Sequence, residues 1–320
     1  MKEFIINKND SGQRLDKFIT KAVPKLPKSL LYKYIRLKRI KLNGKRCEIS
    51  HMLCEGDILN LYINDEFFEN PIGNHKTEII KTNTKLDIIY EDKNILIVYK
   101  PIGMDVHHGA EKPDETLIDI IQAYLYSKNE YNPDEENSFS PAICNRIDRN
   151  TTGLVIAAKN AESLRILNEK IRTRQIDKEY LCICSGNLKK EHSVETAYHS
   201  KGSHNSVYIS SKPKEGYKKI ITEYTILKNK NEFMLLKIHL ITGKTHQIRA
   251  HMSFLGAPLL GDGKYGNVKI NKQQQIFTQQ LCAYSLTFNF DNSGLLGYLS
   301  GKTFTANETG FKLNIFDNIT

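Results

Sequence analysis

The spacing of apolar residues predicts two short helices followed by short strands near the start of the chain. Residues 14–22 and 30–38 carry apolar side chains three or four positions apart, which places them on one face of a helix. The predicted inward residues are Leu15, Phe18, Ile19 and Ala22 in the first helix and Leu30, Leu31, Tyr34 and Ile35 in the second. Asn43-Gly44 and Gly56-Asp57 are typical of tight turns between strands. This pattern indicates a compact α/β module.

Strand-like stretches dominate the chain after residue 86. The predicted strands are residues 87–92, 94–99, 154–158, 179–184, 218–228, 233–241 and 281–290. Residues 161–174 instead show helical spacing at Leu164, Leu167 and Ile171. The sequence has no βαβ repeat with a glycine-rich phosphate loop, which disfavours a nucleotide-binding enzyme. We therefore predict a large α+β domain with a mixed or antiparallel sheet.

A polar, irregular stretch separates these two patterns. Residues 65–85 include Asn70-Pro71, Gly73-Asn74 and a polar run at 81–85. Such a composition is typical of a linker. We therefore expect a small basic module at residues 12–64, a flexible linker at residues 65–85 and a large domain at residues 86–310.

Composition places the chain among ordinary soluble globular proteins. With 320 residues and 40% hydrophobic content, it can bury at least one sizeable core. The apolar stretch at the N-terminus is too short for a secretory signal, and no run approaches the about 18 residues that a membrane helix needs. The six cysteines are scattered without a CxxC pair, which favours reduced packing residues. We expect a cytoplasmic monomer.

The net charge of +10 is concentrated in one short segment. Residues 14–46 contain twelve lysines and arginines but only one acid, Asp16. The twelve are Arg14, Lys17, Lys21, Lys25, Lys28, Lys33, Arg36, Lys38, Arg39, Lys41, Lys45 and Arg46. Helical spacing turns Lys33, Arg36 and Arg39 away from the apolar face. A surface of one sign suits the phosphates of a nucleic acid, although a solvated charged face is the alternative.

A carboxylate between two arginines is the strongest candidate for chemistry. Arg146, Asp148 and Arg149 lie in a polar turn that leads into the apolar strand predicted at residues 154–158. That strand would hold Asp148 at a rigid sheet edge that stays open to a cleft. The neighbouring cations would keep Asp148 ionised, ready to act as a base or nucleophile on an anionic polymer. A plain surface turn is the alternative, because Asp, Asn, Thr and Gly all favour turns.

A second polar cluster follows the strand predicted at residues 233–241. It contains Lys244, His246, Gln247, Arg249 and His251. The two histidines are five residues apart and so do not share a helical face as a zinc pair would, and we expect no metal. His246 and Gln247 either cap a helix that begins near residue 247 or contact substrate. An interior Arg249 needs an anionic partner, which Asp148 or a phosphate could supply.

Several short motifs of the basic module occur in a characteristic order. They are Gly12-Gln13-Arg14-Leu15-Asp16-Lys17-Phe18, the basic helix, Ile40 with Asn43-Gly44-Lys45, and Glu55-Gly56-Asp57. Residues 12–64 therefore resemble the small RNA-binding domain named after ribosomal protein S-four. In that domain the basic helix surface lies against structured RNA, in agreement with the charge pattern. The RNA-binding residues that we expect are Lys28, Lys33, Arg36, Lys38, Arg39 and Lys45.

Four further motifs follow in order along the predicted large domain. They are Asp92 with Lys100-Pro101-Ile102-Gly103, residues 145–153, Asp177-Lys178-Glu179-Tyr180-Leu181, and residues 242–251. Later segments fit the same pattern, namely residues 256–262 with Tyr265-Gly266, and residues 281–283 with 286–288. Residues 86–290 therefore resemble the RluA family of RNA pseudouridine synthases. The resemblance implies an α+β catalytic domain built on a long mixed or antiparallel sheet with a central cleft.

The resemblance also implies roles for individual residues. Asp148 would be the catalytic aspartate, acting on a uridine that is flipped out of structured RNA. Tyr180 would stack on the uracil and help to remove its C5 proton, and Arg249 would pair with Asp148. Arg146 would fill the vacated position in the base stack. The implied substrate-binding residues are Arg146, Arg149, Lys178, Lys244, His246 and Gln247. Neither a metal nor an organic cofactor is expected.

The expected substrate is large-subunit ribosomal RNA, with transfer RNA as an alternative. Asn145 and Lys244 stand where many members of the family have His and Arg, so we expect altered loop support and a loss of bidentate phosphate binding. Asp92, Lys100 and Asp262 are expected to shape loops rather than to carry chemistry. A non-catalytic RNA-binding or ribosome-assembly protein on this scaffold is the main alternative function. A metal-dependent nuclease would need an acidic cluster that these motifs lack.

Overall fold

The computed structural model describes residues 1–68, 82–109, 115–202, 206–291, 294–311 and 316. The chain divides into two compact units. The first comprises Met1–Leu86, Ile118–Ala142 and Ala158–Arg165, and the second comprises Asp87–Leu117, Ile143–Ala157 and Ile166–Thr320. The predicted linker at residues 65–85 begins with a short 3-10 helix, η1 (Asp65–Phe67), and most of it, residues 69–81, lies outside the described residues.

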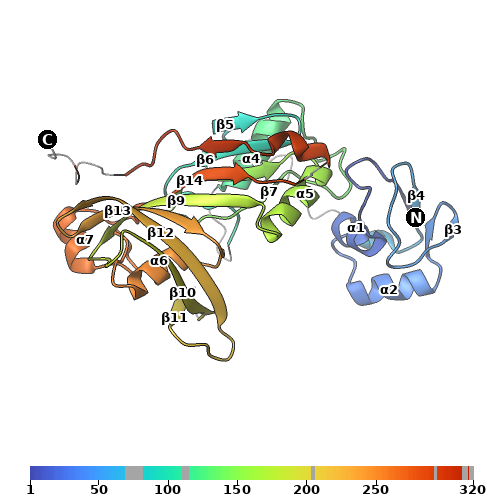
Figure 1. Ribbon diagram of the computed structural model, residues 1–320. Coiled ribbons are helices and arrows are strands. Elements are labelled where there is room, and N and C mark those ends of the chain that lie inside the picture. Colours follow the sequence, from blue (N-terminus) through green and yellow to red (C-terminus); the bar gives the residue numbers. More distant parts are fainter. Residues whose placement is uncertain (69–81, 110–114, 203–205, 292–293, 312–315, 317–320) are drawn as a thin grey trace. The chain divides into compact units, whose positions relative to one another are not determined.

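The first unit contains the predicted basic module. Its elements are β1 (Lys2–Ile5), α1 (Leu15–Ala22), α2 (Lys28–Arg36), β2 (Ile40–Leu42), β3 (Lys45–Arg46) and β4 (Ile58–Leu61). The four strands form an antiparallel sheet in the order β1-β4-β2-β3. Helices α1 and α2 and strands β3 and β4 of this module are labelled in Figure 1. Both predicted helices are confirmed. The sheet also contains β1, which precedes the boundary that we placed at residue 12.

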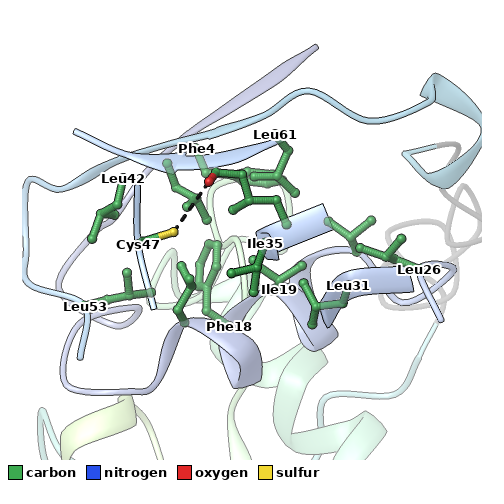
Figure 2. Close-up of a cluster of buried hydrophobic side chains, with 14 of the residues drawn as sticks. Phe4, Phe18, Ile19, Leu26, Leu31, Ile35, Leu42, Cys47, Leu53 and Leu61 are labelled. Atoms are coloured by element: carbon green, nitrogen blue, oxygen red, sulfur yellow. Dashed lines mark hydrogen bonds between the residues drawn. The ribbon is translucent and has the colours of Figure 1, made fainter. Parts of the chain in front are cut away.

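The apolar faces of these two helices pack against the sheet. Phe18 and Ile19 of α1 are fully buried, and Leu31 and Ile35 of α2 are at most 5% exposed. Figure 2 shows these side chains converging beneath the strands, with the thiol of Cys47 donating to the carbonyl of Ile40 at 3.6 Å. Burial of such side chains stabilises the module by roughly 1.5 to 3 kcal/mol each. The helical spacing in the sequence therefore identified the core.

The chain after residue 86 forms an eleven-stranded sheet. Its strands are β5 (Asp87–Glu91), β6 (Ile95–Lys100), β7 (Ala142–Ile143), β8 (Thr152–Ala158), β9 (Ile176–Ser185), β10 (His192–Lys201), β11 (Val207–Ser210), β12 (Lys218–Lys230), β13 (Phe233–Leu240), β14 (Leu281–Phe288) and β15 (Thr303–Thr305). Nine of them follow the order β11-β10-β12-β13-β9-β14-β8-β6-β5, with β15 beside β14 and β7 beside β8. Strands β14 and β8 are parallel, whereas β9 is antiparallel to both β13 and β14. The expected mixed sheet is confirmed.

Strands β6 and β8 lie in the interior of this sheet. Every residue of both strands is buried, which explains why the sequence there is a continuous apolar run rather than an alternating one. Gly153 of β8 has φ +110°, and a Cβ built there would lie 2.2 Å from the carbonyl oxygen of Ala283. Only glycine therefore allows β8 and β14 to approach each other this closely at that point.

The remaining helices are α4 (Leu117–Ser127), α5 (Ala161–Arg172), α6 (Gln247–Phe254), α7 (Val268–Gln274) and the 3-10 helix η2 (Gly294–Leu299). Helix α5 matches the helix predicted at residues 161–174, and α6 begins at the expected residue. The sequence patterns did not predict α4 or β10. All six cysteines are free thiols. Within the described ranges, no helix combines the length and apolarity required to cross a bilayer.

Candidate active site

Asp148 lies in the loop between β7 and β8, and a buried side chain supports this loop from behind. Asn145 is 6% exposed, and its amide oxygen accepts the backbone N–H of Ile156 at 2.7 Å. Its amide nitrogen donates to the carbonyl of Leu154 at 3.2 Å. Asn145 thus binds the backbone of β8 at two points, which agrees with the loop-supporting role expected for it. The backbone N–H of Thr151 closes the turn on the carbonyl of Asp148 at 3.0 Å.

Lys100, the last residue of β6, also binds the loop that carries Asp148. Its ammonium is fully buried and donates to the carbonyls of Pro101, Met104 and Arg149 at 2.8 to 2.9 Å. Burial lowers the pKa of Lys100 to about 8, and the three carbonyls use all three N–H donors of the charged form. These contacts agree with the expectation that Lys100 shapes a loop.

Arg149 also holds this part of the chain in place, and it is not among the residues that line the cavity described below. Its Nε donates to the carbonyl of Gly103 at 3.0 Å, and its Nη1 lies 3.6 Å from a carboxylate oxygen of Asp105. The side chain therefore holds the loop that follows β6. The family resemblance implied that Arg149 binds substrate, but its side chain binds Gly103 and Asp105 and is not among the residues that line the cavity.

An open cavity lies over Asp148, with about 370 Å³ of space that includes part of the surrounding solvent. Its walls come from the Asp148 loop, β9, the end of β13, the start of α6 and the start of β14. The lining residues are Arg146, Ile147, Asp148, Thr151, Tyr180, Leu240, Lys244, His246, Gln247, Ile248, Arg249 and Leu281. Cationic and apolar groups thus surround a single carboxylate, a composition suited to a planar, polar ring attached to phosphates.

Arg249, on α6, is the partner of Asp148. It is 8% exposed, and its Nη1 donates to Oδ2 of Asp148 at 2.7 Å. Its other edge binds Asp262, with Nε to Oδ2 at 2.7 Å and Nη2 to Oδ1 at 3.1 Å. Burial alone would lower the pKa of Arg249, but the two carboxylates outweigh it and raise that pKa. Arg249 therefore has two anionic partners of the kind that an interior arginine requires, Asp148 and Asp262.

Tyr180 forms one wall of the cavity. It lies on β9 opposite Ile238 of β13 and is 7% exposed. Burial, and after it the negative charge of Asp148, raises the pKa of the Tyr180 hydroxyl. The phenol is therefore protonated at neutral pH and presents a flat, neutral ring.

His246 lies between Asp148 and a second tyrosine. Its Nδ1 is 3.0 Å from the hydroxyl of Tyr265, and its Nε2 is 3.9 Å from Oδ2 of Asp148. Burial lowers the pKa of His246, against the opposing effect of Asp148. His246 occupies the position before α6 with φ 51°, but its side chain makes no capping hydrogen bond. The capping role that we considered for His246 is therefore wrong, and its side chain lines the cavity instead.

Gln247 holds the backbone of the loop before α6. Its side-chain oxygen accepts the backbone N–H of Lys244 at 3.1 Å and the hydroxyl of Thr242 at 3.0 Å. Its side-chain nitrogen donates to the hydroxyl of Thr222 at 3.0 Å, which in turn lies 2.9 Å from Nδ1 of His251. His251 is fully buried, and burial lowers its pKa to about 4. This network fixes the side of the cavity that carries Lys244.

The structure brings together most of the residues that the sequence singled out. Those that line the cavity are Arg146, Asp148, Tyr180, Lys244, His246, Gln247 and Arg249. Lys178 lies on β9 two residues before Tyr180 and, like Arg149, does not line the cavity. Burial lowers the pKa of Lys178. The part of the chain that is described contains no group of three or more metal-ligating side chains.

Sequence reasoning missed the contributions of Asp262, Tyr265 and Thr222. Asp262 was expected only to shape a loop, and Tyr265 was named only as a member of a motif. Their side chains reach Arg249 and His246 across 13 and 19 positions of sequence. No local pattern indicates such contacts, because helix and strand periodicity reports only which face of an element is buried.

In the first unit, all six expected RNA-binding cations are exposed. Lys28, Lys33 and Arg36 lie on α2, and Lys38, Arg39 and Lys45 follow it. The segment therefore presents positive charge while its apolar residues face the core.

Comparison with family models agrees with both resemblances. The model of RNA pseudouridylate synthases matches residues 94–254, and that of the S4 domain matches residues 13–59. The first match includes Asp148, Tyr180 and Arg249, and the second includes the basic helix.

Individual relatives cover most of the chain. An uncharacterized RNA pseudouridine synthase of Mycoplasma capricolum is 37% identical over 311 residues, which are 96% of this chain and 98% of that protein. The ribosomal large subunit pseudouridine synthase D of Escherichia coli strain K12 is 31% identical over 267 residues, which are 82% of this chain and 75% of that protein. The solved structure of human RNA pseudouridylate synthase domain containing 4 has a TM-score of 0.54 at 21% identity, covers 73% of this chain and 92% of its own, and shows a shared fold.

Proposed function

This chain belongs to the family of RNA pseudouridine synthases, and we propose that it isomerises specific uridines of large-subunit ribosomal RNA, with Asp148 as the catalytic carboxylate. The observation that carries this proposal is the environment of Asp148. Among the described residues that line the cavity it is the only carboxylate, and its side chain is 30% exposed. A carboxylate that Arg249 binds at one oxygen can still present its other oxygen to a substrate.

The reaction converts one isomer into another. The C1′–N1 bond breaks, the uracil turns, and a C1′–C5 bond forms while C5 loses a proton and N1 gains one. Substrate and product therefore contain the same atoms, and the balance requires no external reactant. Asp148 can serve either as a nucleophile at C1′ or as a base at the ribose, since both roles need an ionised, partly exposed carboxylate.

A reaction at Asp148, which lines the cavity, requires that the uridine leave its stack. The base must be extruded before its sugar can reach Asp148, because a paired base is shielded by its neighbours. The ring of Tyr180 offers a flat wall for the extruded uracil. With its raised pKa, Tyr180 enters the reaction as a protonated phenol, which suits stacking better than proton abstraction. Arg146 is exposed at the cavity and is long enough to occupy the vacated place in the stack.

The RNA partner is proposed from two observations. Several relatives of this chain, among them that of Escherichia coli, are named for the large ribosomal subunit. The S4 domain adds a second, basic surface, which suits a large structured RNA with many phosphates beyond the target uridine. Transfer RNA is the competing substrate and is tested in the same experiment.

The test uses purified full-length protein and total RNA from a strain that lacks the gene. Wild-type protein should restore pseudouridine at particular large-subunit positions, whereas Asp148→Asn should restore none, with its RNA affinity unchanged. Asp291→Asn, a surface carboxylate outside the cavity, should behave as wild type. Modified transfer RNA in place of ribosomal RNA would overturn the substrate assignment. Activity of the Asp148→Asn protein would overturn the catalytic assignment.

A further inference from the structure

A second carboxylate, that of the buried Asp262, binds Arg249 and does not line the cavity. Its side chain is fully buried, and both oxygens face the guanidinium of Arg249. Oδ1 also accepts the backbone N–H groups of Lys264 at 2.8 Å and Tyr265 at 3.0 Å. Burial alone would raise the pKa of Asp262, but the hydrogen bonds from Arg249 outweigh it and lower the pKa. Asp262 is therefore an ionised group in a fixed orientation.

The two hydrogen bonds from Arg249 to Asp262, here called the fork, determine which nitrogen of Arg249 can bind Asp148. Asp262 occupies Nε and Nη2, so Arg249 reaches Asp148 only through Nη1, at Oδ2. His246 approaches the same oxygen. Within the described residues, Oδ1 of Asp148 receives no hydrogen bond. Without Asp262, the guanidinium could turn and bind both oxygens of Asp148, the bidentate arrangement that arginine favours with carboxylates.

The charges support the same conclusion. Asp148 and Arg249 alone would form a neutral pair, in which the cation acts on Asp148 without competition. With Asp262 the three groups carry one net negative charge, and the positive charge of Arg249 is shared between two carboxylates. An arginine that two carboxylates share still holds Asp148 in place. It lowers the basicity and nucleophilicity of Asp148 less than an arginine paired with Asp148 alone would.

We propose that Asp262 is a positioning residue for the isomerisation: it confines Arg249 to a single contact with Oδ2 of Asp148 and so leaves Oδ1 to meet the substrate. The inference rests on the proposed function, because it assumes that Asp148 is the reacting carboxylate. It goes beyond that function by assigning the two oxygens of Asp148 to different tasks and by giving the turn after Gly261 a role in the rate.

The test compares Asp262→Asn with wild type in kcat, KM and the pH profile of kcat. Asparagine keeps the shape but turns an amide donor toward the guanidinium, so the fork opens. We expect kcat to fall about 100-fold, because a small displacement at a reacting group costs that much. We expect KM to change less than about threefold, since Asp262 does not line the cavity. The acidic limb of the kcat profile should move to lower pH, because Arg249 then acts on Asp148 alone.

Asn271→Ala is the matched control. The Asn271 side chain accepts the N–H of Gly261 at 2.8 Å and donates to the carbonyl of Asp262 at 3.2 Å, so it supports the same turn without touching Arg249. It should lower the melting temperature and leave the acidic limb in place. If Asn271→Ala moves the limb as Asp262→Asn does, damage to the turn is a sufficient cause and the inference is overturned.

Asp262→Glu provides a second variant if Asp262→Asn does not fold. It keeps the charge but lengthens the side chain, so we expect a kcat about tenfold lower, with the acidic limb unmoved. Wild-type kcat in whichever variant folds overturns the inference. Asp148→Asn is measured in parallel, and its activity would instead overturn the proposed function, so the two failures are distinguishable.

Discussion

The cations of helix α2 and the arginine of the cavity are the same kind of residue in opposite situations. Lys28, Lys33 and Arg36 are exposed, and none has an ion pair among the described residues. Arg249 is 8% exposed, and all three of its nitrogens bind carboxylates. The first group is free to follow the phosphates of an RNA. The second can move very little.

Because the cations of α2 are exposed and Arg249 is buried, the two should affect different properties: the affinity for RNA and the geometry of the cavity. An exposed cation contributes to RNA binding through its charge, and salt screens that contribution. A buried cation is costly to desolvate and is stable only when its partners compensate it fully. Changes on α2 should therefore alter how tightly RNA binds and how salt affects binding. Changes around Arg249 should alter the stability of the fold and the rate of reaction.

The largest effect is expected for Arg249→Met, which leaves the buried Asp262 without its cationic partner. We expect the free energy of unfolding to fall by about 3 to 5 kcal/mol, the usual cost of breaking a buried ion pair from one side. Urea denaturation at neutral pH measures it. Arg146→Met removes an arginine from the same cavity, but an exposed one, and should change the free energy of unfolding by no more than about 0.5 kcal/mol. Equal losses in the two variants would contradict the contrast between buried and exposed cations.

A pH-dependent loss of stability is expected from His251, the buried neutral group of the network behind Lys244. Burial lowers its pKa to about 4 from an ordinary value of 6.5. Between these pH values the unfolded chain binds a proton that the folded protein rejects, so stability falls as the pH drops from about 6.5 to about 4. The difference between the two pKa values corresponds to about 3 kcal/mol in the free energy of unfolding.

Denaturation midpoints measured over this pH range test the effect. His251→Gln should flatten the dependence, because glutamine does not titrate. His51→Gln, at an exposed position of the first unit, should leave the slope of wild type unchanged. A slope that survives in His251→Gln would assign the dependence to other groups.

The two regions also differ in how much the sequence could predict. On α1 and α2, the core and the exposed cations follow from one local rule, the helical spacing of Phe18, Ile19, Leu31 and Ile35. Helix α4 was missed for the converse reason. Most of its residues, among them Leu117, Ile120, Ile121 and Leu125, are buried, so its sequence is apolar on nearly every side and lacks a clear period.

The cavity could be predicted only in part. Asp148 and Arg249 were proposed as partners although 101 residues separate them, because an interior arginine needs an anion and the motifs supplied one. The fork of Asp262 and the place of His246 depend on side-chain directions in turns, which no periodicity records. Arg149 shows the limit most clearly, since it follows Asp148 directly and yet binds Gly103 and Asp105.

The smallest effect in free energy is expected on α2, where Lys28, Lys33 and Arg36 would be replaced together by Gln. Removing a cation that binds a phosphate should reduce the slope of log affinity against log salt by about 0.7 to 0.9. RNA affinity should fall about tenfold at low salt and less at high salt, with stability unchanged. Filter binding of a ribosomal RNA fragment at several salt concentrations measures both quantities.

The matched control removes the same charge elsewhere. Lys189, Lys190 and Lys228 are exposed in the second unit, and their joint replacement by Gln lowers the net charge by the same three units. If both triple variants change the salt slope equally, RNA senses only the total charge, and the S4 surface has no special role. If only the α2 variant changes it, while turnover at saturating RNA stays that of wild type, then α2 provides affinity and Arg249 provides geometry, as their burial implies.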